Sequence, residues 1–165
     1  MNHLEHIESK IWRMGNELEW QLNVWRFHEH KIVFSNGCFD ILHLGHIDYL
    51  AKAASEGNLL IVGLNSDASV SRIKGKNRPI TDEKSRAMKL AALGFVGAVV
   101  IFEEDTPEKL IEMVQPDVLV KGKDYDEKDI VGADIVKAKG GKVITIDLVE
   151  GYSTTALIEK IKGQE

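Results

Sequence analysis

From Phe34 to His46 the sequence reads FSNGCFDILHLGH, which has the pattern of a buried strand, a glycine turn and the first turn of a helix. Gly37 permits a tight turn after the strand, and Gly45 lets the backbone come close to a ligand. His43 and His46 stand three residues apart, so both imidazoles can lie on the same side of the first helical turn. Because the free backbone amides there favour an anion, the segment predicts a phosphate site.

Two other interpretations of this segment stay open when it is considered alone. An isolated H-x-G-H sequence is often no more than two surface histidines beside a glycine turn. A metal site is disfavoured, because no third ligand follows at a suggestive spacing and the nearby carboxylates do not cluster. In an open parallel sheet, ligands gather at the carboxyl ends of the strands, so the strand that precedes these histidines favours the phosphate site.

Outside this segment, apolar runs rich in β-forming residues alternate with helical segments from Lys31 onward. Continuous apolar strands separated by helices are typical of an α/β fold, in which helices cover both faces of a parallel sheet. We expect strands at residues 31–36, 59–65, 98–102, 117–121 and 142–147. We expect helices at residues 45–56, 67–73, 82–93, 107–114, 128–139 and 154–162.

The first 30 residues differ from the rest, because apolar residues from Leu4 to Trp25 recur at helical spacing. This pattern predicts an amphipathic N-terminal helix that packs on the domain or on a second copy of the chain. A membrane or partner-specific role is the alternative, and Gly15 weakens the expectation of an unbroken helix. We therefore divide the chain into an N-terminal helical extension at residues 1–30 and one α/β domain at residues 31–165.

The composition fits one globular domain, with 44% hydrophobic and 28% charged residues in 165. The net charge of −5 argues against a broad nucleic-acid surface, which needs clustered Lys and Arg. The longest apolar runs, at residues 59–64 and 96–102, are far shorter than the roughly 20 residues that cross a bilayer. With the single cysteine Cys38 and no signal-peptide core, we expect a cytoplasmic protein that binds neither nucleic acid nor membrane.

Two later segments place phosphate-binding residue types after predicted strands. Lys121 and Gly122 open a lysine-glycine loop in which Asp124 can accept hydrogen bonds from ribose hydroxyls. A simple charged loop explains these residues equally well. Ser153 and Thr154 belong to a run of hydroxyls at a helix start, where they can cap the helix, seat a polyphosphate, or do both.

A basic, glycine-containing loop at residues 72–79 carries Lys74 and Arg78. It predicts either a mobile solvated loop or a flap that closes positive charge over phosphates. Arg86, on the helix that follows, can support such a flap or pair with neighbouring carboxylates.

Taken in order along the chain, these segments resemble the cytidylyltransferase-like family of H-x-G-H nucleotidyltransferases. The resemblance covers about residues 31–162, and the order and spacing of the segments make it more specific than any one motif. Within the family, the sequence is most similar to the heptose 1-phosphate adenylyltransferase branch. The segments that carry the resemblance are residues 36–46, 78–79, 104–107, 117–125 and 151–155.

The resemblance implies a Rossmann-like open parallel sheet of order 3-2-1-4-5. It also implies transfer of AMP from ATP to D-glycero-β-D-manno-heptose 1-phosphate, with Mg²⁺ assisting. The products would be pyrophosphate and ADP-heptose, a lipopolysaccharide precursor. The expected partners are therefore ATP and a sugar phosphate, and both the family and the N-terminal aromatic stripe favour a homodimer.

Roles carried over by position are expectations of the same kind. The residues expected to act in catalysis are His43, His46 and Lys74. The residues expected at the nucleotide are Asn36, Gly37, Phe39, His43, His46, Lys121, Gly122, Asp124, Ser153 and Thr154. The residues expected near the acceptor are Asp40, Asn65, Asp67 and Arg78. No protein ligand to a metal is expected.

The sequence departs from the family in its last motif. Ile158 stands where many relatives have an arginine that reaches the triphosphate, and Tyr152 stands where the heptose branch often has cysteine.

Other functions remain compatible with these segments. A glycerol-3-phosphate cytidylyltransferase and an FAD-synthetase-like adenylyltransferase would use nearly the same motifs. A nucleotide-binding regulator without turnover is the non-catalytic alternative. A dehydrogenase is disfavoured, because no G-x-G-x-x-G follows the first predicted strand.

Overall fold

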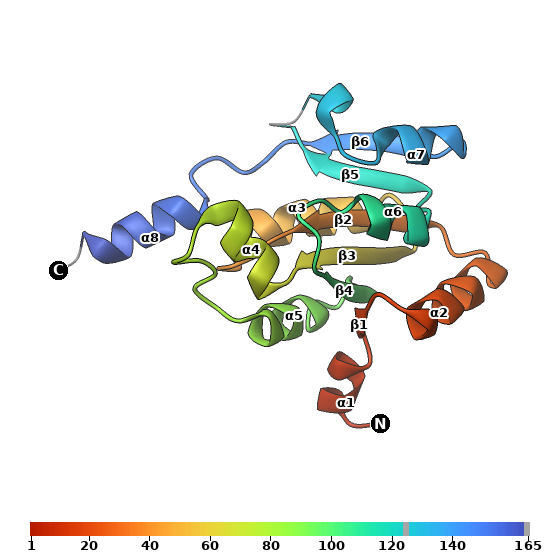
Figure 1. The fold of residues 1–165 in the computed structure, drawn as a ribbon, viewed down its shortest axis with the longest axis horizontal. Helices are drawn as coiled ribbons and strands as arrows, with labels where there is room; N and C mark the ends of the chain where they lie inside the picture. The colour runs from red at the N-terminus through yellow and green to blue at the C-terminus, as the bar shows by residue number, and fades with distance from the viewer. Residues whose placement is uncertain (124–125, 164–165) are drawn as a thin grey trace.

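The computed structural model describes residues 1–123 and 126–163, which form a six-stranded parallel sheet between two layers of helices (Figure 1). The strands lie in the order β1-β4-β3-β2-β5-β6, and every neighbouring pair is parallel. This confirms the predicted fold class: the five expected strands follow the order 3-2-1-4-5, and β1 adds one more at the edge beside β4. The strands are β1 (Ile11–Arg13), β2 (Ile32–Gly37), β3 (Leu59–Asn65), β4 (Ala98–Phe102), β5 (Val118–Gly122) and β6 (Lys142–Ile146).

Two apolar cores, one on each face of the sheet, hold the helices in place. Successive residues of β2 point to opposite faces, so Phe34 belongs to one core and Val33 to the other. The first core is covered by α2 (Asn16–Phe27), α6 (Glu108–Val114) and α7 (Ala133–Ala138). The second is covered by α3 (Leu44–Ala54) and α5 (Glu83–Ala91). Because both faces are covered, every residue of β3 is buried.

The remaining helical elements contribute no fully buried residue to these two cores. They are α1 (His3–Glu8), α4 (Asp67–Lys74), the 3₁₀ helix η1 (Glu127–Asp129) and α8 (Thr154–Lys162). Figure 1 shows α4 and α8 at the end of the sheet where the strands β5 and β6 finish, with α8 extending away from the body of the fold.

The prediction of a single N-terminal helix is wrong, because residues 11–13 form a strand. Ile11 and Arg13 lie in register with Val99 and Ile101 of β4, so this segment supplies hydrogen bonds that the edge of β4 would otherwise lack. The chain turns at Gly15, which has a φ of 156°, before α2 begins. Among the residues described, no helix is long and apolar enough to cross a membrane.

The periodic apolar residues of the N-terminal segment still pack inward, although they belong to separate elements. Leu18 and Leu22 of α2 are fully buried in the same core as Phe34. Arg13 forms ion pairs with Glu83 at the start of α5 and with Glu103 after β4. The N-terminal segment is therefore joined to the main sheet by strand pairing, by packing and by charge.

Candidate active site

A cavity of about 400 Å³ lies at the carboxyl ends of β2 and β5. Parallel strands end at the same edge of a sheet, so the loops after them meet there. The cavity is bordered by the loop after β2, the first turn of α3 and the segment that leads into α8. Sequence-predicted residues that line it are Asn36, Gly37, Phe39, Asp40, His43, His46, Lys74, Arg78, Lys121, Gly122, Ser153 and Thr154.

The two histidines lie face to face at the start of α3. Their ring centroids are 3.7 Å apart with an angle of 21° between the planes. Phe39 contacts the His46 ring edge-on at 5.2 Å, and the Tyr152 ring lies 6.5 Å from that of His43. A Cβ added at Gly45 would come within 3.1 Å of the His43 ring and 3.2 Å of the Tyr152 Cβ, so a glycine here makes the stack possible.

Each histidine presents an unsatisfied nitrogen. The Nδ1 atoms of His43 and His46 are both buried, and neither has a hydrogen-bond partner among the described residues. His43 is also the N-cap residue of α3, but its side chain makes no capping hydrogen bond. A buried polar atom without a partner is costly, so these two nitrogens are suited to a ligand that supplies the missing hydrogen bonds.

Burial lowers the pKa of both histidines, so both rings are neutral at pH 7. Burial, together with the nearby His43, lowers the pKa of His46 to about 4, although a hydrogen bond with the backbone of Ile41 opposes this shift. Burial also lowers the pKa of His43 below its ordinary value. A polyanion beside the rings would favour their charged forms and raise both pKa values, so anion binding here is coupled to proton binding.

Asp40 fastens the basic loop to the end of β2. Its buried carboxylate accepts hydrogen bonds from the backbone amides of Ile80 and Thr81, both at 2.9 Å, and from Arg78 Nε at 2.7 Å. Burial alone would raise the pKa of Asp40, but these hydrogen bonds outweigh it and hold the pKa below its ordinary value. Asp40 and Arg78 therefore line the cavity while also fixing the loop that borders it.

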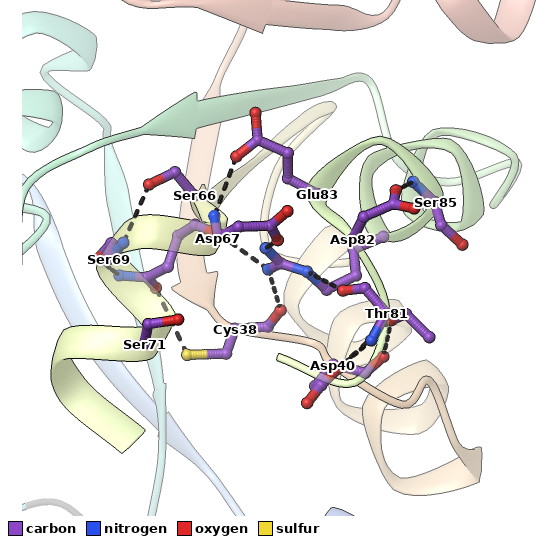
Figure 2. Close-up of polar contacts among 12 residues, drawn as sticks. Cys38, Asp40, Ser66, Asp67, Ser69, Ser71, Thr81, Asp82, Glu83 and Ser85 are labelled. Atoms are coloured by element: carbon purple, nitrogen blue, oxygen red, sulfur yellow. Dashed lines mark hydrogen bonds and ion pairs between the residues drawn. The ribbon is translucent and has the colours of Figure 1, made fainter. Parts of the chain in front are cut away.

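Arg86 ties three loops together beneath the cavity, and sequence reasoning did not assign it this role. Its guanidinium is fully buried and donates to the carbonyl oxygens of Cys38 at 2.7 Å, Asn65 at 2.8 Å and Thr81 at 3.0 Å. It also donates to Asp67 Oδ1 at 2.7 Å. Figure 2 shows three of these partners, Cys38, Asp67 and Thr81, facing one another from the loops after β2 and β3 and from the segment that leads into α5. The only sequence signal is a charged residue within the apolar stripe of α5.

Two lysines bring positive charge to the cavity. Lys121 Nζ donates a hydrogen bond to Asn36 Oδ1, which joins the ends of β5 and β2. Lys74, at the end of α4, makes no hydrogen bond or ion pair within the described part of the chain. Residues 1–123 and 126–163 contain no group of three or more His, Cys, Asp or Glu that could hold a metal ion. Asp124 lies outside the described residues.

The start of α8 closes one side of the cavity. Ser153 is the N-cap residue and accepts a hydrogen bond from the Ala156 amide at 3.0 Å. Ser153, Thr154 and Thr155 all line the cavity. The hydroxyl run thus caps the helix and also faces the site, which are the two arrangements that the sequence left open.

A second cavity of about 310 Å³ adjoins the first. Both cavities are lined by Asn36, Gly37, Cys38, Lys74 and Lys121. Asn65 lines only the second, together with residues 105–107 after β4 and residues 129–131 at the end of η1 and beyond it. Residues 105–107 were predicted only as part of a segment that carries the resemblance, and neither group was assigned a role in the site. Asp67 lines neither of these two cavities, because its carboxylate is paired with Arg86.

The chain is similar to known proteins in both sequence and fold. The family model for cytidylyltransferase-like proteins matches residues 34–160. The chain is 52% identical over 157 residues to a protein named "Bifunctional protein HldE" from Nitrobacter hamburgensis, covering 95% of this chain and 32% of that protein. A protein of the same name from Pseudomonas aeruginosa is 59% identical over 137 residues, covering 83% of this chain and 29% of its own length. The chain thus spans about a third of the length of the curated relatives it matches.

The chain is also similar in fold to a solved structure. The crystal structure of the lipopolysaccharide core biosynthesis protein from Thermoplasma volcanium superposes with a TM-score of 0.62 at 31% identity. The match covers 73% of this chain and 99% of that one.

Proposed function

The chain belongs to the cytidylyltransferase-like family, and from this membership we propose that it is an adenylyltransferase that transfers AMP from ATP to D-glycero-β-D-manno-heptose 1-phosphate. The observation that carries the proposal is the stacked histidine pair, whose two unsatisfied Nδ1 atoms are buried beside the cavity at the start of α3. The heptose acceptor is supported by the similarity to proteins whose names refer to HldE and to lipopolysaccharide core biosynthesis.

In the proposed reaction, a phosphate oxygen of the sugar attacks the α-phosphorus of ATP in line with the departing oxygen. The new bond joins the two phosphates, the bond from the α-phosphorus to the bridging oxygen breaks, and pyrophosphate leaves with the electron pair. The attacking phosphate is already ionised, so the protein contributes positioning and charge stabilisation rather than a general base. His43, His46 and Lys74 supply that stabilisation around the α-phosphate and the leaving group.

The nucleotide occupies the first cavity in this proposal. The amides and hydroxyls at the start of α8, with Ser153 and Thr154, bind the β- and γ-phosphates. The nucleoside side is formed by Asn36, Gly37, Phe39, Lys121 and Gly122, with Asp124 as the partner expected for the ribose. Tyr152, whose ring lies 6.5 Å from that of His43, closes the side of the cavity formed by the segment that leads into α8.

We propose that Mg²⁺ binds together with ATP. Phosphate oxygens are ligands that Mg²⁺ prefers, and the ion usually keeps several waters as well. The side chains around the histidines are mainly donors and cations, which suits phosphate oxygens better than a metal ion. When bound, Mg²⁺ neutralises part of the charge on the triphosphate.

We place the proposed reaction in the cytoplasm, where ATP is available. Residues 31–165 form the transferase domain and residues 1–30 its extension. The exposed side chains of Leu4, Trp20 and Phe27 on that extension support a homodimer.

The acceptor and nucleotide are tested together by measuring pyrophosphate release. The assay pairs ATP or CTP with heptose 1-phosphate, glycerol 3-phosphate or FMN, and each pair is repeated with His46→Ala. We expect release with ATP and heptose 1-phosphate at a rate at least ten times that of any other pair. Faster release with CTP and glycerol 3-phosphate, or with ATP and FMN, would replace the proposed substrates. Nucleotide binding by calorimetry without release from any pair would indicate a regulator.

A further inference from the structure

We infer that the second cavity is the acceptor subsite, which seats the ring of a polyhydroxylated sugar phosphate and recognises its hydroxyls through Asp129 and Thr106. The inference rests on the proposed function, which it extends by assigning residues that determine acceptor specificity.

The residues that line both cavities, which we call the shared floor, place the acceptor phosphate within reach of the nucleotide. The end of β2 and two lysines, Lys74 and Lys121, line both cavities. The histidines and the start of α8 line only the first, so the triphosphate belongs there. A sugar phosphate in the second cavity would therefore place its phosphate at the shared floor, next to the α-phosphate that it must attack.

The charge of the second cavity fixes the direction of the acceptor. Its lysines lie on the shared floor, whereas the carboxylates of Asp105 and Asp129 belong to the second cavity alone. Positive groups at one side and acceptors at the other orient a molecule that carries a phosphate at one end and hydroxyl donors at the other. The reverse orientation would place the phosphate beside the carboxylate of Asp129, which has no ion-pair partner among the described residues.

The lining of the second cavity suits both the apolar C–H groups and the hydroxyls of a sugar ring. Ile73, Pro107, Ile130 and Val131 provide aliphatic contacts for its C–H groups. Asn65, Thr106, Asp105 and Asp129 provide the polar contacts for its hydroxyls. A volume of about 310 Å³ lies at the small end of the range for ligand pockets, which suits one sugar ring.

Some polar side chains of the second cavity already make hydrogen bonds or ion pairs within the protein, and others do not. Asp105 pairs with Arg72, and the buried Asn65 amide donates to Ser69 Oγ. The side chains of Asp129 and Thr106 make no hydrogen bond or ion pair with other described residues. Asp129 and Thr106 are therefore the groups with full capacity to bind hydroxyls, and a pocket that hydrogen-bonds a hydroxyl discriminates strongly against analogues that lack it.

Two variants of the full chain test this assignment. Asp129→Asn removes the charge but keeps the shape, and Val131→Trp fills the cavity from its aliphatic wall. The matched control is Asp134→Asn, which alters an exposed carboxylate on α7 that lines neither cavity. Initial rates of pyrophosphate release give the KM for ATP and for heptose 1-phosphate, and calorimetry gives the affinity for ATP alone.

We expect Asp129→Asn to raise the KM for heptose 1-phosphate by ~10-fold or more, as for the loss of a hydrogen bond to a charged group. Val131→Trp should raise it further, and in both variants the affinity for ATP should stay within ~2-fold of the wild type. The control should match the wild type in all three values. An unchanged KM for heptose 1-phosphate in both variants, or a loss of ATP affinity instead, would overturn the assignment. Absence of AMP transfer by the wild type would instead overturn the proposed function.

Discussion

The His46 ring lies between Phe39 and His43, with its Nδ1 atom unsatisfied among the described residues. We predict that His46→Ala lowers kcat by at least ~100-fold, comparable to the loss of one oxyanion donor, because the ring stabilises charge that develops in the transition state. Steady-state kinetics would measure the change, with circular dichroism to verify the fold. His28→Ala, which alters an exposed histidine, is the control. Near-normal turnover in a folded His46→Ala protein would remove His46 from the mechanism.

From the lowered pKa of His46 we also predict that the protein takes up protons when it binds ATP. Because the pKa of His46 is about 4, the ring is neutral at pH 6.5, and a triphosphate beside it favours the charged form. Calorimetry of ATP binding at pH 6.5, in two buffers with different ionisation enthalpies, should show net proton uptake. His46→Gln should reduce the uptake. Apparent enthalpies that do not depend on the buffer would show that neither histidine gains a proton.

At the scale of elements, Arg86 joins the loops after β2 and β3 to the start of α5. Arg86→Leu leaves Asp67 unpaired and several carbonyls without their donor, so we predict a loss of at least ~3 kcal/mol in the free energy of unfolding. Urea titration would measure the loss. Lys84→Met, which alters an exposed cation on the same helix, should cost less than ~0.5 kcal/mol. A similar, small loss in both variants would show that Arg86 does not hold these loops.

Elements with continuous apolar sequences were predictable, and those that depend on a distant partner were not. The strands β2 to β5 were identified because burial on both faces leaves an apolar run in the sequence. The less buried β6 was identified because its sequence is rich in β-branched residues. The segment at residues 11–13 was assigned to a helix because its apolar spacing gives no sign of the β4 edge with which it pairs. The sheet order came from the family resemblance rather than from the strand sequences.

The site was predictable to a similar extent. The histidine pair was identified because a glycine turn and a helix start surround it in the sequence, and its contact with Phe39 follows from the same segment. Arg86 was predicted only as a support for the basic loop or as a partner of neighbouring carboxylates, because its acceptors Cys38 and Asn65 lie in loops far from it in the sequence. Thr106 and Asp129 were missed because a hydroxyl before a helix and a carboxylate in a loop are ordinary residues until the fold places them in one cavity. The division of the chain at residue 30 stays a prediction.

For the whole molecule, the shifted pKa values predict a loss of stability in acid. The pKa values of His43 and His46 lie below their ordinary value of 6.5, so the unfolded chain binds more protons than the folded protein as the pH falls below about 6.5. The lowered pKa of Asp40 adds a further loss at lower pH, as the unfolded carboxylate becomes protonated first. We expect Tm to fall steadily from pH 7 to pH 4, and His46→Gln to flatten that slope. An unchanged slope in His46→Gln would contradict the burial of a neutral ring.

The central claim is that the molecule transfers the α-phosphorus of ATP, with its adenosine, to a sugar phosphate. Following the label from [α-³²P]ATP and from [γ-³²P]ATP in parallel reactions with heptose 1-phosphate tests this directly. We expect the α label to appear in ADP-heptose and the γ label to appear only in pyrophosphate. Transfer of the γ label to the sugar, or no labelled sugar product from either nucleotide, would contradict it.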